Sequence, residues 1–204
     1  MPQWVFDYVI RPGFGGFLRA VNRIRFRGLE NIPADGGVIL AANHQTYLDP
    51  FLLSIMLKRP TRYLAWNEAF SWKLTGKFMY AFGALPIQLE GGDRTATRRA
   101  RDWLAKDGAL VIFPEGGRGN PDGSLMRLKS GTARLALDAG VPILPVSLRG
   151  AHRLWNRTQK LPRPTTLEIT YHPLMRVACE AGEDERTAAR RITDELAAHI
   201  ASGL

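Results

Sequence analysis

The chain has 204 residues with 45% hydrophobic side chains, which suits one buried core and leaves too little length for two full domains. Its 28 lysines and arginines exceed its 19 aspartates and glutamates, and the net charge of +9 indicates anionic partners without separating nucleic acid from phospholipid or phosphorylated metabolites. Cys179 is the single cysteine, so an intramolecular disulfide is excluded and a reducing compartment is the simplest assumption.

The N-terminal segment, residues 1–27, interleaves aromatic residues with arginines, from Trp4 to Arg27. This mixture is typical of an amphipathic helix on an anionic membrane, with the aromatics at the interface and the arginines toward the headgroups. An ordinary helix docked on the core is the alternative. Pro12 and neighbouring glycines interrupt the apolar residues, so we expect neither a signal peptide nor a spanning helix. We therefore predict a cytoplasmic protein held peripherally at the inner face of the cell membrane.

Residues 28–204 are predicted to form one α/β domain, because strand and helix patterns alternate. The expected elements are a buried strand at 38–42, a helix opened by Asp49 and Pro50, a helix at 93–106, strands at 109–113, 141–148 and 167–171, a helix at 130–139, and a C-terminal helix from Asp184. Pro142 and Pro145 indicate an edge position or irregular ends for the 141–148 strand. We expect a mainly parallel sheet flanked by helices, with a site beyond the carboxyl ends of its strands.

The turn after the first buried strand contains an imidazole and a carboxylate. His44 and Asp49 are five residues apart, so in one continuous helix they would lie about 140° apart and would not meet. Across a strand-to-helix turn they can meet, and a carboxylate on one ring nitrogen then leaves the other nitrogen free to take a proton from an alcohol. We interpret His44 as a candidate general base and Asp49 as its orienting partner. Alternatively, Asp49 only caps the helix that Pro50 begins, and His44 is structural.

A glycine-rich segment, residues 113–119, follows another expected strand and reads Phe-Pro-Glu-Gly-Gly-Arg-Gly. Its glycines allow backbone N–H groups to approach an anion, Arg118 can hold a phosphate with two parallel hydrogen bonds, and Lys129 can add a positive contact. The alternative is a turn with a solvated arginine. Motifs of nucleotide-binding loops, serine hydrolases and zinc proteases are missing, and no Cys/His cluster indicates a metal site.

Four segments together resemble the glycerolipid acyltransferases typified by 1-acyl-glycerol-3-phosphate (lysophosphatidate) acyltransferase. Residues 43–49 are similar to the family's N-H-x-x-x-x-D signature, and residues 113–119 resemble its F-P-E-G-T-R-S block. Residues 128–131 and 141–146 resemble the later F-K-x-G and V-P-I-x-P-V blocks. The resemblance extends over about residues 28–173.

The resemblance implies His44 as the base, Asp49 as its partner, and an acceptor site that includes Glu115, Gly116, Gly117, Arg118 and Lys129. It also implies an activity in phospholipid biosynthesis, in which acyl-CoA or an acyl carrier protein donates an acyl group to the hydroxyl of 1-acyl-glycerol-3-phosphate without a cofactor, a metal or a covalent acyl-enzyme. Gly117 and Gly119 stand where the family has threonine and serine, which removes two hydroxyl groups from the site.

The second family block departs from the pattern, because Gln88 and Leu89 replace an acidic residue and the arginine that helps the family hold the acceptor phosphate. Arg94, shortly afterwards, can supply that charge if the residues between loop out, although Asp93 equally fits the start of a helix. The apolar stretch 69–82 suits either an acyl-chain path or core packing.

The sequence therefore leaves several alternatives for the identity of the acceptor. The same chemistry fits glycerol-3-phosphate or a lyso-ornithine lipid. A non-catalytic binder of anionic lipid is the rival from another class. Nucleic acid is not expected, because the motif residues gather at strand ends and do not form an aromatic and basic stripe.

Overall fold

The computed structural model describes residues 3–66, 84–87 and 94–204, and its centre is a seven-stranded sheet in the order β1-β7-β6-β2-β5-β3-β4. All neighbouring strands are parallel except β6 and β7. The strands are β1 (Arg23–Arg27), β2 (Val38–Ala42), β3 (Thr61–Trp66), β4 (Ala84–Ile87), β5 (Ala109–Ile112), β6 (Ile143–Arg149) and β7 (Thr166–Tyr171). The α/β fold with a mainly parallel sheet is thereby confirmed.

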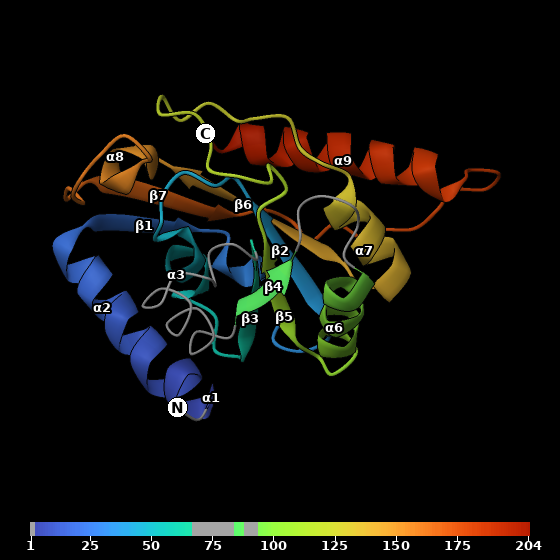
Figure 1. Cartoon of the computed structure of the whole chain (residues 1–204), viewed down its shortest axis with the longest axis horizontal. Coiled ribbons are helices and arrows are strands. Elements are labelled where there is room, and N and C mark those ends of the chain that lie inside the picture. The colour runs from blue at the N-terminus through green and yellow to red at the C-terminus, as the bar shows by residue number, and fades with distance from the viewer. Residues whose placement is uncertain (1–2, 67–83, 88–93) are drawn as a thin grey trace.

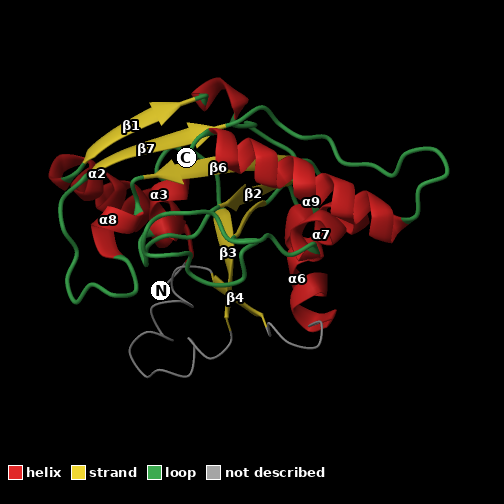
Figure 2. Cartoon of the chain, turned by 90° about the horizontal axis from the view of Figure 1, so that it is seen from above, coloured by secondary structure: helices red, strands yellow, loops and turns green. Residues whose placement is uncertain are grey.

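Helices cover both faces of this sheet (Figure 1). The helical elements are α1 (Gln3–Val5), a π-helical turn (Phe6–Ile10), α2 (Arg11–Val21), a 3₁₀ turn (Leu29–Asn31), α3 (Asp49–Ser54), α6 (Arg94–Leu104), α7 (Gly131–Ala139), α8 (His152–Trp155) and α9 (Glu185–Ser202). Figure 2 shows α6, α7 and α9 together on one side of the molecule and α2, α3 and α8 on the other. Two cores result, one on each face of the sheet.

Strand β2 shows why the sheet needs both layers. All five of its residues are buried, and their side chains alternate between the two cores. Val38 and Leu40 pack on the side of α2 and α3, whereas Ile39 packs with α6, α7 and α9. A continuous apolar run is the pattern of a strand covered on both faces, as the sequence predicted.

The N-terminal segment is helical only as far as Val21, and this differs from the sequence interpretation. Arg23–Arg27 form β1, an edge strand that pairs in parallel with β7. Ile24 and Phe26 pack against the core, and the arginines between them are exposed. The interleaving of apolar residues and arginines at 23–27 thus reflects the two-residue period of a strand.

Arg11 fastens α2 to the body of the protein. Its guanidinium is buried and donates to Thr61 Oγ1 at 2.7 Å and to the carbonyl oxygens of Leu57 and Arg59, each at 3.0 Å. Asp7 lies 4.0 Å away from it. Because charged groups are buried only when they are paired, these contacts fix one face of the helix on the core.

Other positions of the same segment expose large apolar side chains. They are Trp4, Tyr8, Val9, Phe17 and Val21. The segment therefore combines the two sequence interpretations, a helix docked on the core and an amphipathic surface. Among the helices of the described residues, none has the length and apolar character needed to cross a bilayer.

The expected edge position of the 141–148 strand is wrong, because β6 lies inside the sheet between β7 and β2. Pro145 is aligned with Ala41 of β2, and its carbonyl accepts a hydrogen bond from His172 N at 2.9 Å. The regular β6–β7 pairing stops at Val146, so the missing N–H of Pro145 falls where the ladder is already irregular. That irregularity lets an internal strand contain a proline.

Candidate active site

His44 and Asp49 meet across the turn between β2 and α3, as their spacing predicted. His44 Nδ1 and Asp49 Oδ2 are 2.8 Å apart. The Asp49 side chain is fully buried, and the His44 side chain keeps 20% of its surface exposed. A buried carboxylate on Nδ1 fixes the tautomer with the proton on that nitrogen. Within the part of the chain that the structure describes, Nε2 has no hydrogen-bond partner, so it is free to accept a proton.

Asp49 organises the turn as well as the imidazole. Its Oδ2 also accepts hydrogen bonds from Gln45 N at 2.5 Å and Thr46 N at 2.8 Å. Burial raises the pKa of Asp49, and the hydrogen bonds from His44, Thr46 and Gln45 oppose that rise by favouring the ionised form. The alternative role of Asp49 as a helix cap is wrong: Leu48 occupies the cap position, without a side-chain bond, and the carboxylate turns back toward the preceding turn.

Glu115 connects the two motif segments. It follows β5, the parallel neighbour of β2, so both motifs emerge at the same edge of the sheet. Glu115 Oε1 accepts from His44 N at 2.6 Å, and Oε2 accepts from Met126 N at 2.9 Å. The side chain is only 3% exposed, and burial raises the pKa of Glu115 against the two hydrogen bonds. The carboxylate therefore holds the backbone under the imidazole.

Three further contacts immobilise the histidine. The His44 ring stacks on Phe113, with 4.1 Å between centroids and 17° between planes. The preceding residue, Asn43, forms paired hydrogen bonds with the backbone of Leu148 in β6, at 3.1 and 2.8 Å. The His44 carbonyl accepts from Gly119 N at 2.5 Å. The imidazole is thus held from β2, β5 and β6 together.

The glycine-rich loop brings two cations to this edge. Gly116 has a φ of +72°, which glycine adopts without strain, and the Lys129 side chain crosses directly over it. A Cβ at Gly116 would lie 2.6 Å from Lys129 Nζ, so a larger residue would displace that cation. Arg118 lies over the ring of Tyr47, with its Cζ 3.7 Å from the centroid. Gly117 is exposed beside them.

The remaining expected residues lie elsewhere. Arg94 is exposed at the first residue of α6, a helix that packs on β4, β5 and α7, and no contact in the described residues joins it to the His44 turn. Gln88, Leu89, Asp93 and the stretch 69–82 fall outside the described residues.

Several participants carried no signal in the sequence. The backbone N–H groups of Gln45 and Thr46 become visible only in three dimensions, and so does the ring contact of Phe113. Tyr47 and Trp155 lie side by side near Arg118, with 4.9 Å between ring centroids, although more than a hundred residues separate them in the sequence. Among the described residues, no group of three or more His, Cys, Asp or Glu side chains is arranged to hold a metal ion.

Taken together, these side chains form a base with a buried orienting carboxylate, beside two cations. Such an arrangement can deprotonate a hydroxyl group and hold an anion nearby.

Comparison with known proteins gives a consistent result. The family model described as Acyltransferase matches residues 23–149. A 1-acyl-sn-glycerol-3-phosphate acyltransferase of Pseudomonas aeruginosa is 33% identical over 189 residues, covering 84% of this chain and 66% of that protein. The enzyme of the same name from Bacillus subtilis is 31% identical over 123 residues, covering 59% of this chain and 60% of that protein. The chain thus spans less than two thirds of the length of either relative.

Among solved structures, the chain resembles the 1-acyl-sn-glycerophosphate acyltransferase of Thermotoga maritima, with a TM-score of 0.72. The match covers 95% of this chain and 78% of that protein at 23% identity. This likeness establishes the fold.

Proposed function

The chain belongs to the acyltransferase family, and we propose that it transfers an acyl group from a thioester donor, acyl-CoA or an acyl carrier protein, to the hydroxyl of 1-acyl-glycerol-3-phosphate. The observation that carries this proposal is the 2.8 Å contact between His44 Nδ1 and Asp49 Oδ2, which leaves Nε2 of a partly exposed imidazole free. The names of the relatives support the choice of acceptor.

In the proposed mechanism, His44 Nε2 takes the proton from the acceptor hydroxyl as its oxygen attacks the thioester carbonyl. The tetrahedral intermediate then collapses and expels the thiolate, which receives the proton from the imidazolium. Asp49 stabilises the imidazolium through Nδ1, and Glu115 holds the backbone of His44 in place. General base catalysis of this kind contributes a factor of about 10² to 10⁴ in rate.

The exposed apolar face of the N-terminal segment supports a peripheral position at an anionic membrane. Tyr8 and Phe17 are each 58% exposed, and Arg19 lies on α2 together with Phe17. Aromatic rings at the interface and arginines toward phosphate groups suit such a surface. A lysophospholipid acceptor resides in the same membrane, so this attachment would bring the site to its substrate.

The test is release of free thiol from acyl-CoA and from an acylated carrier protein, with a panel of acceptors. The panel consists of 1-acyl-glycerol-3-phosphate, glycerol-3-phosphate, lyso-ornithine lipid and no acceptor. We expect release that depends on 1-acyl-glycerol-3-phosphate, and we expect kcat to fall by about 10² or more in His44→Ala. His199→Ala, a histidine on α9, is the matched control and should keep full activity.

Preference for another acceptor in the panel would move the proposal to that substrate. Thiol release with no acceptor dependence, or full activity in His44→Ala, would overturn it.

A further inference from the structure

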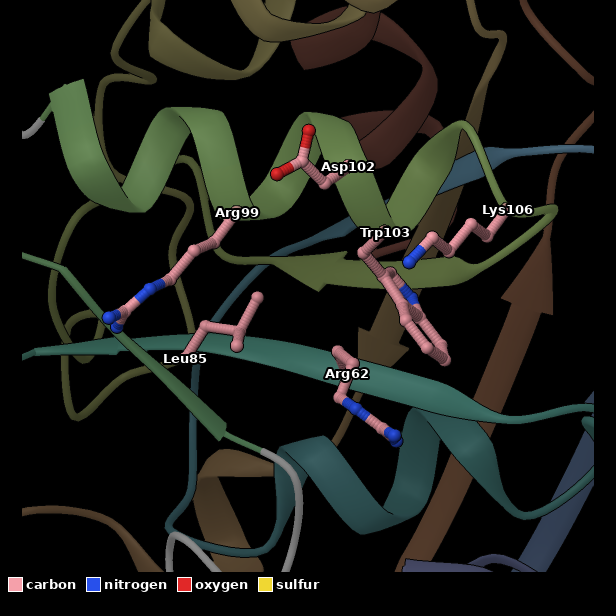
Figure 3. A pocket seen from close by; sticks show the side chains of 6 residues that line it. All are labelled: Arg62, Leu85, Arg99, Asp102, Trp103 and Lys106. Carbon is pink, nitrogen blue, oxygen red and sulfur yellow. The ribbon is translucent and has the colours of Figure 1, made fainter.

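Among the described residues, Arg19, Arg62 and Arg118 lie over aromatic rings, and the two with the shorter distances, Arg62 and Arg118, differ in whether their charge is neutralised. Arg62 lies over Trp103 with its Cζ 4.2 Å from the centroid, and its Nη1 is 3.5 Å from the carboxylate of Asp7. Figure 3 shows this pair beside a cavity of about 200 Å³. The cations around that cavity do not converge, because Arg99 points away from Arg62 and Lys106.

Arg118 differs from Arg62 in having no counter-ion among the described residues. Its guanidinium is closer to its ring, at 3.7 Å from the centroid of Tyr47, but no carboxylate in the described residues lies within ion-pair distance. Its Nε is buried and has no hydrogen-bond partner among those residues. A partly buried guanidinium without an anion is costly, so this arrangement fits a cation that waits for a ligand.

Two aromatic rings support Arg118: Tyr47 contacts the guanidinium, and Trp155 contacts Tyr47. Tyr47 lies in the turn between His44 and Asp49 and is 44% exposed. Trp155, the last residue of α8, contacts the Tyr47 ring at 4.9 Å between centroids. A guanidinium that lies flat on a ring has one face covered and keeps its in-plane N–H donors free for a bidentate contact with an oxyanion.

We propose that Tyr47 and Trp155 are positioning residues that hold the guanidinium of Arg118 flat for one anionic group of the acceptor, a phosphate. The inference rests on the proposed function, because it names how that site distinguishes a phosphate-bearing acceptor from a neutral one. Tyr47 sits three residues after His44, so the same turn carries the base and the support of the anion site. The base that removes the proton and the ring that supports the phosphate site then lie close together.

The first test compares substitutions of Tyr47 and Trp155 that remove the aromatic ring with substitutions that keep it. Tyr47→Leu removes the ring and should raise the acceptor KM for 1-acyl-glycerol-3-phosphate about tenfold, the effect expected of a partly desolvated cation–π contact. The donor KM and the kinetics with monoacylglycerol, which lacks the phosphate, should stay unchanged. Tyr47→Phe keeps the ring and should behave like the wild type. Trp155→Leu should give a smaller rise of the same kind, and Trp155→Phe should restore it.

Controls separate positioning from general damage. Trp103→Leu removes the ring under Arg62 and should leave the acceptor KM unchanged, and melting temperatures are measured for every variant. In an Arg118→Lys background, Tyr47→Leu should have no further effect, because the planar group that the ring holds is gone. An equal loss with both acceptors, or an additive effect in the double variant, would overturn the proposal.

Equilibrium binding keeps the inference separate from the enzymatic activity. The dissociation constant of 1-acyl-glycerol-3-phosphate is measured by calorimetry for the wild type and for Tyr47→Leu. Absence of thiol release in the wild type would defeat the proposed function. Roughly tenfold weaker binding by Tyr47→Leu would still support the phosphate site, and equal binding would refute it.

Discussion

The turn that carries His44 and the N-terminal segment that carries Arg11 are fixed in opposite ways. At the turn, carboxylates accept hydrogen bonds from backbone N–H groups, and each bond aims the imidazole. In the N-terminal segment, an arginine donates to backbone carbonyls and anchors the helix, while several large apolar side chains stay exposed. The first arrangement requires particular residues. The second requires one anchor and a suitable composition.

This contrast predicts that substitutions at the turn change catalysis and leave folding nearly intact, whereas substitutions in the N-terminal segment change stability or membrane binding and leave the chemistry intact.

The largest expected effect is that of Asp49→Asn on kcat. An amide oxygen can still accept from Gln45 N and Thr46 N, but it cannot stabilise an imidazolium as a carboxylate does. We expect kcat to fall by about 10² or more. Because burial penalises the charge of Asp49, the neutral variant should keep a melting temperature close to that of the wild type.

Kinetics and thermal unfolding of the same preparation of Asp49→Asn show whether activity is lost without a loss of stability. A variant that loses stability in proportion to activity would place Asp49 with the structural residues and would break the contrast between the two regions.

The next effect in size is that of Arg11→Met on stability. The substitution removes the Arg11 hydrogen bond from the carbonyl of Leu57, removes one of two donors from the carbonyl of Arg59, and weakens the neutralisation of Asp7. We expect a loss of about 2 kcal/mol in the free energy of unfolding, which is less than the roughly 3–5 kcal/mol typical of a broken buried ion pair, because Arg62 still faces Asp7.

Arg19→Met is the matched control on the same helix. Arg19 is exposed and lies 5.6 Å from the ring centroid of Phe26, so its loss should cost less than about 1 kcal/mol. Urea denaturation measures both variants, and equal losses would show that α2 has no specific anchor.

The sequence predicted the fold where a single pattern had one interpretation. The apolar run at 38–42 and the capped C-terminal helix, where Asp184 accepts from Thr187 N, appear as expected. The segment 23–27 was misread, because five residues of alternating arginines and apolar side chains fit both a strand and a membrane-surface helix. The interior position of β6 stayed open, because the two prolines fit either an edge strand or a strand with irregular ends, and the structure has the second: the regular β6–β7 pairing ends at Val146, next to Pro145.

Within the site, the spacing of His44 and Asp49 was sufficient to predict their contact, since two residues at this spacing meet across a turn and not along a helix. The inward orientation of Glu115 was not predictable, because a carboxylate in a glycine-rich loop can face either solvent or backbone. The contact of Tyr47 with Trp155 depends on where α8 returns to the sheet edge, and no local pattern contains that information.

A smaller effect is expected for membrane binding. Replacing Trp4, Tyr8 and Phe17 together by serine removes the exposed aromatic surface of the N-terminal segment. Association with anionic vesicles should weaken by at least about tenfold, and salt should weaken the association of the wild type. Vesicle flotation measures both effects, and thiol release from acyl-CoA in the presence of a water-soluble acceptor should be unchanged.

Leu161→Ser provides the control, because Leu161 is 74% exposed but lies between α8 and β7. If Leu161→Ser weakened vesicle association as much as the triple variant, the N-terminal segment would not be the specific membrane-binding surface.

The smallest effect is a change in how stability depends on pH, and it compares Glu115 with Asp184. Burial raises the folded-state pKa of Glu115 above its ordinary value, so this group contributes stability at acid pH that is lost as pH rises from about 4.5 through the raised pKa. Hydrogen bonds from Thr187 lower the pKa of Asp184, so its contribution is present above pH 3.8 and is lost as pH falls through the lowered pKa. The two carboxylates therefore have opposite signs.

Glu115→Gln and Asp184→Asn each remove one of these contributions. Relative to the wild type, Glu115→Gln should show its larger stability deficit toward acid pH, because only there does the wild type escape the cost of burying the charge. Asp184→Asn should show its deficit at neutral pH and approach the wild type below about pH 3.8. Urea denaturation at intervals from pH 3 to pH 7 measures both differences on one scale. If the deficit of Glu115→Gln instead grew toward neutral pH, hydrogen bonding would outweigh burial at Glu115, and its carboxylate would stabilise the His44 turn as an anion.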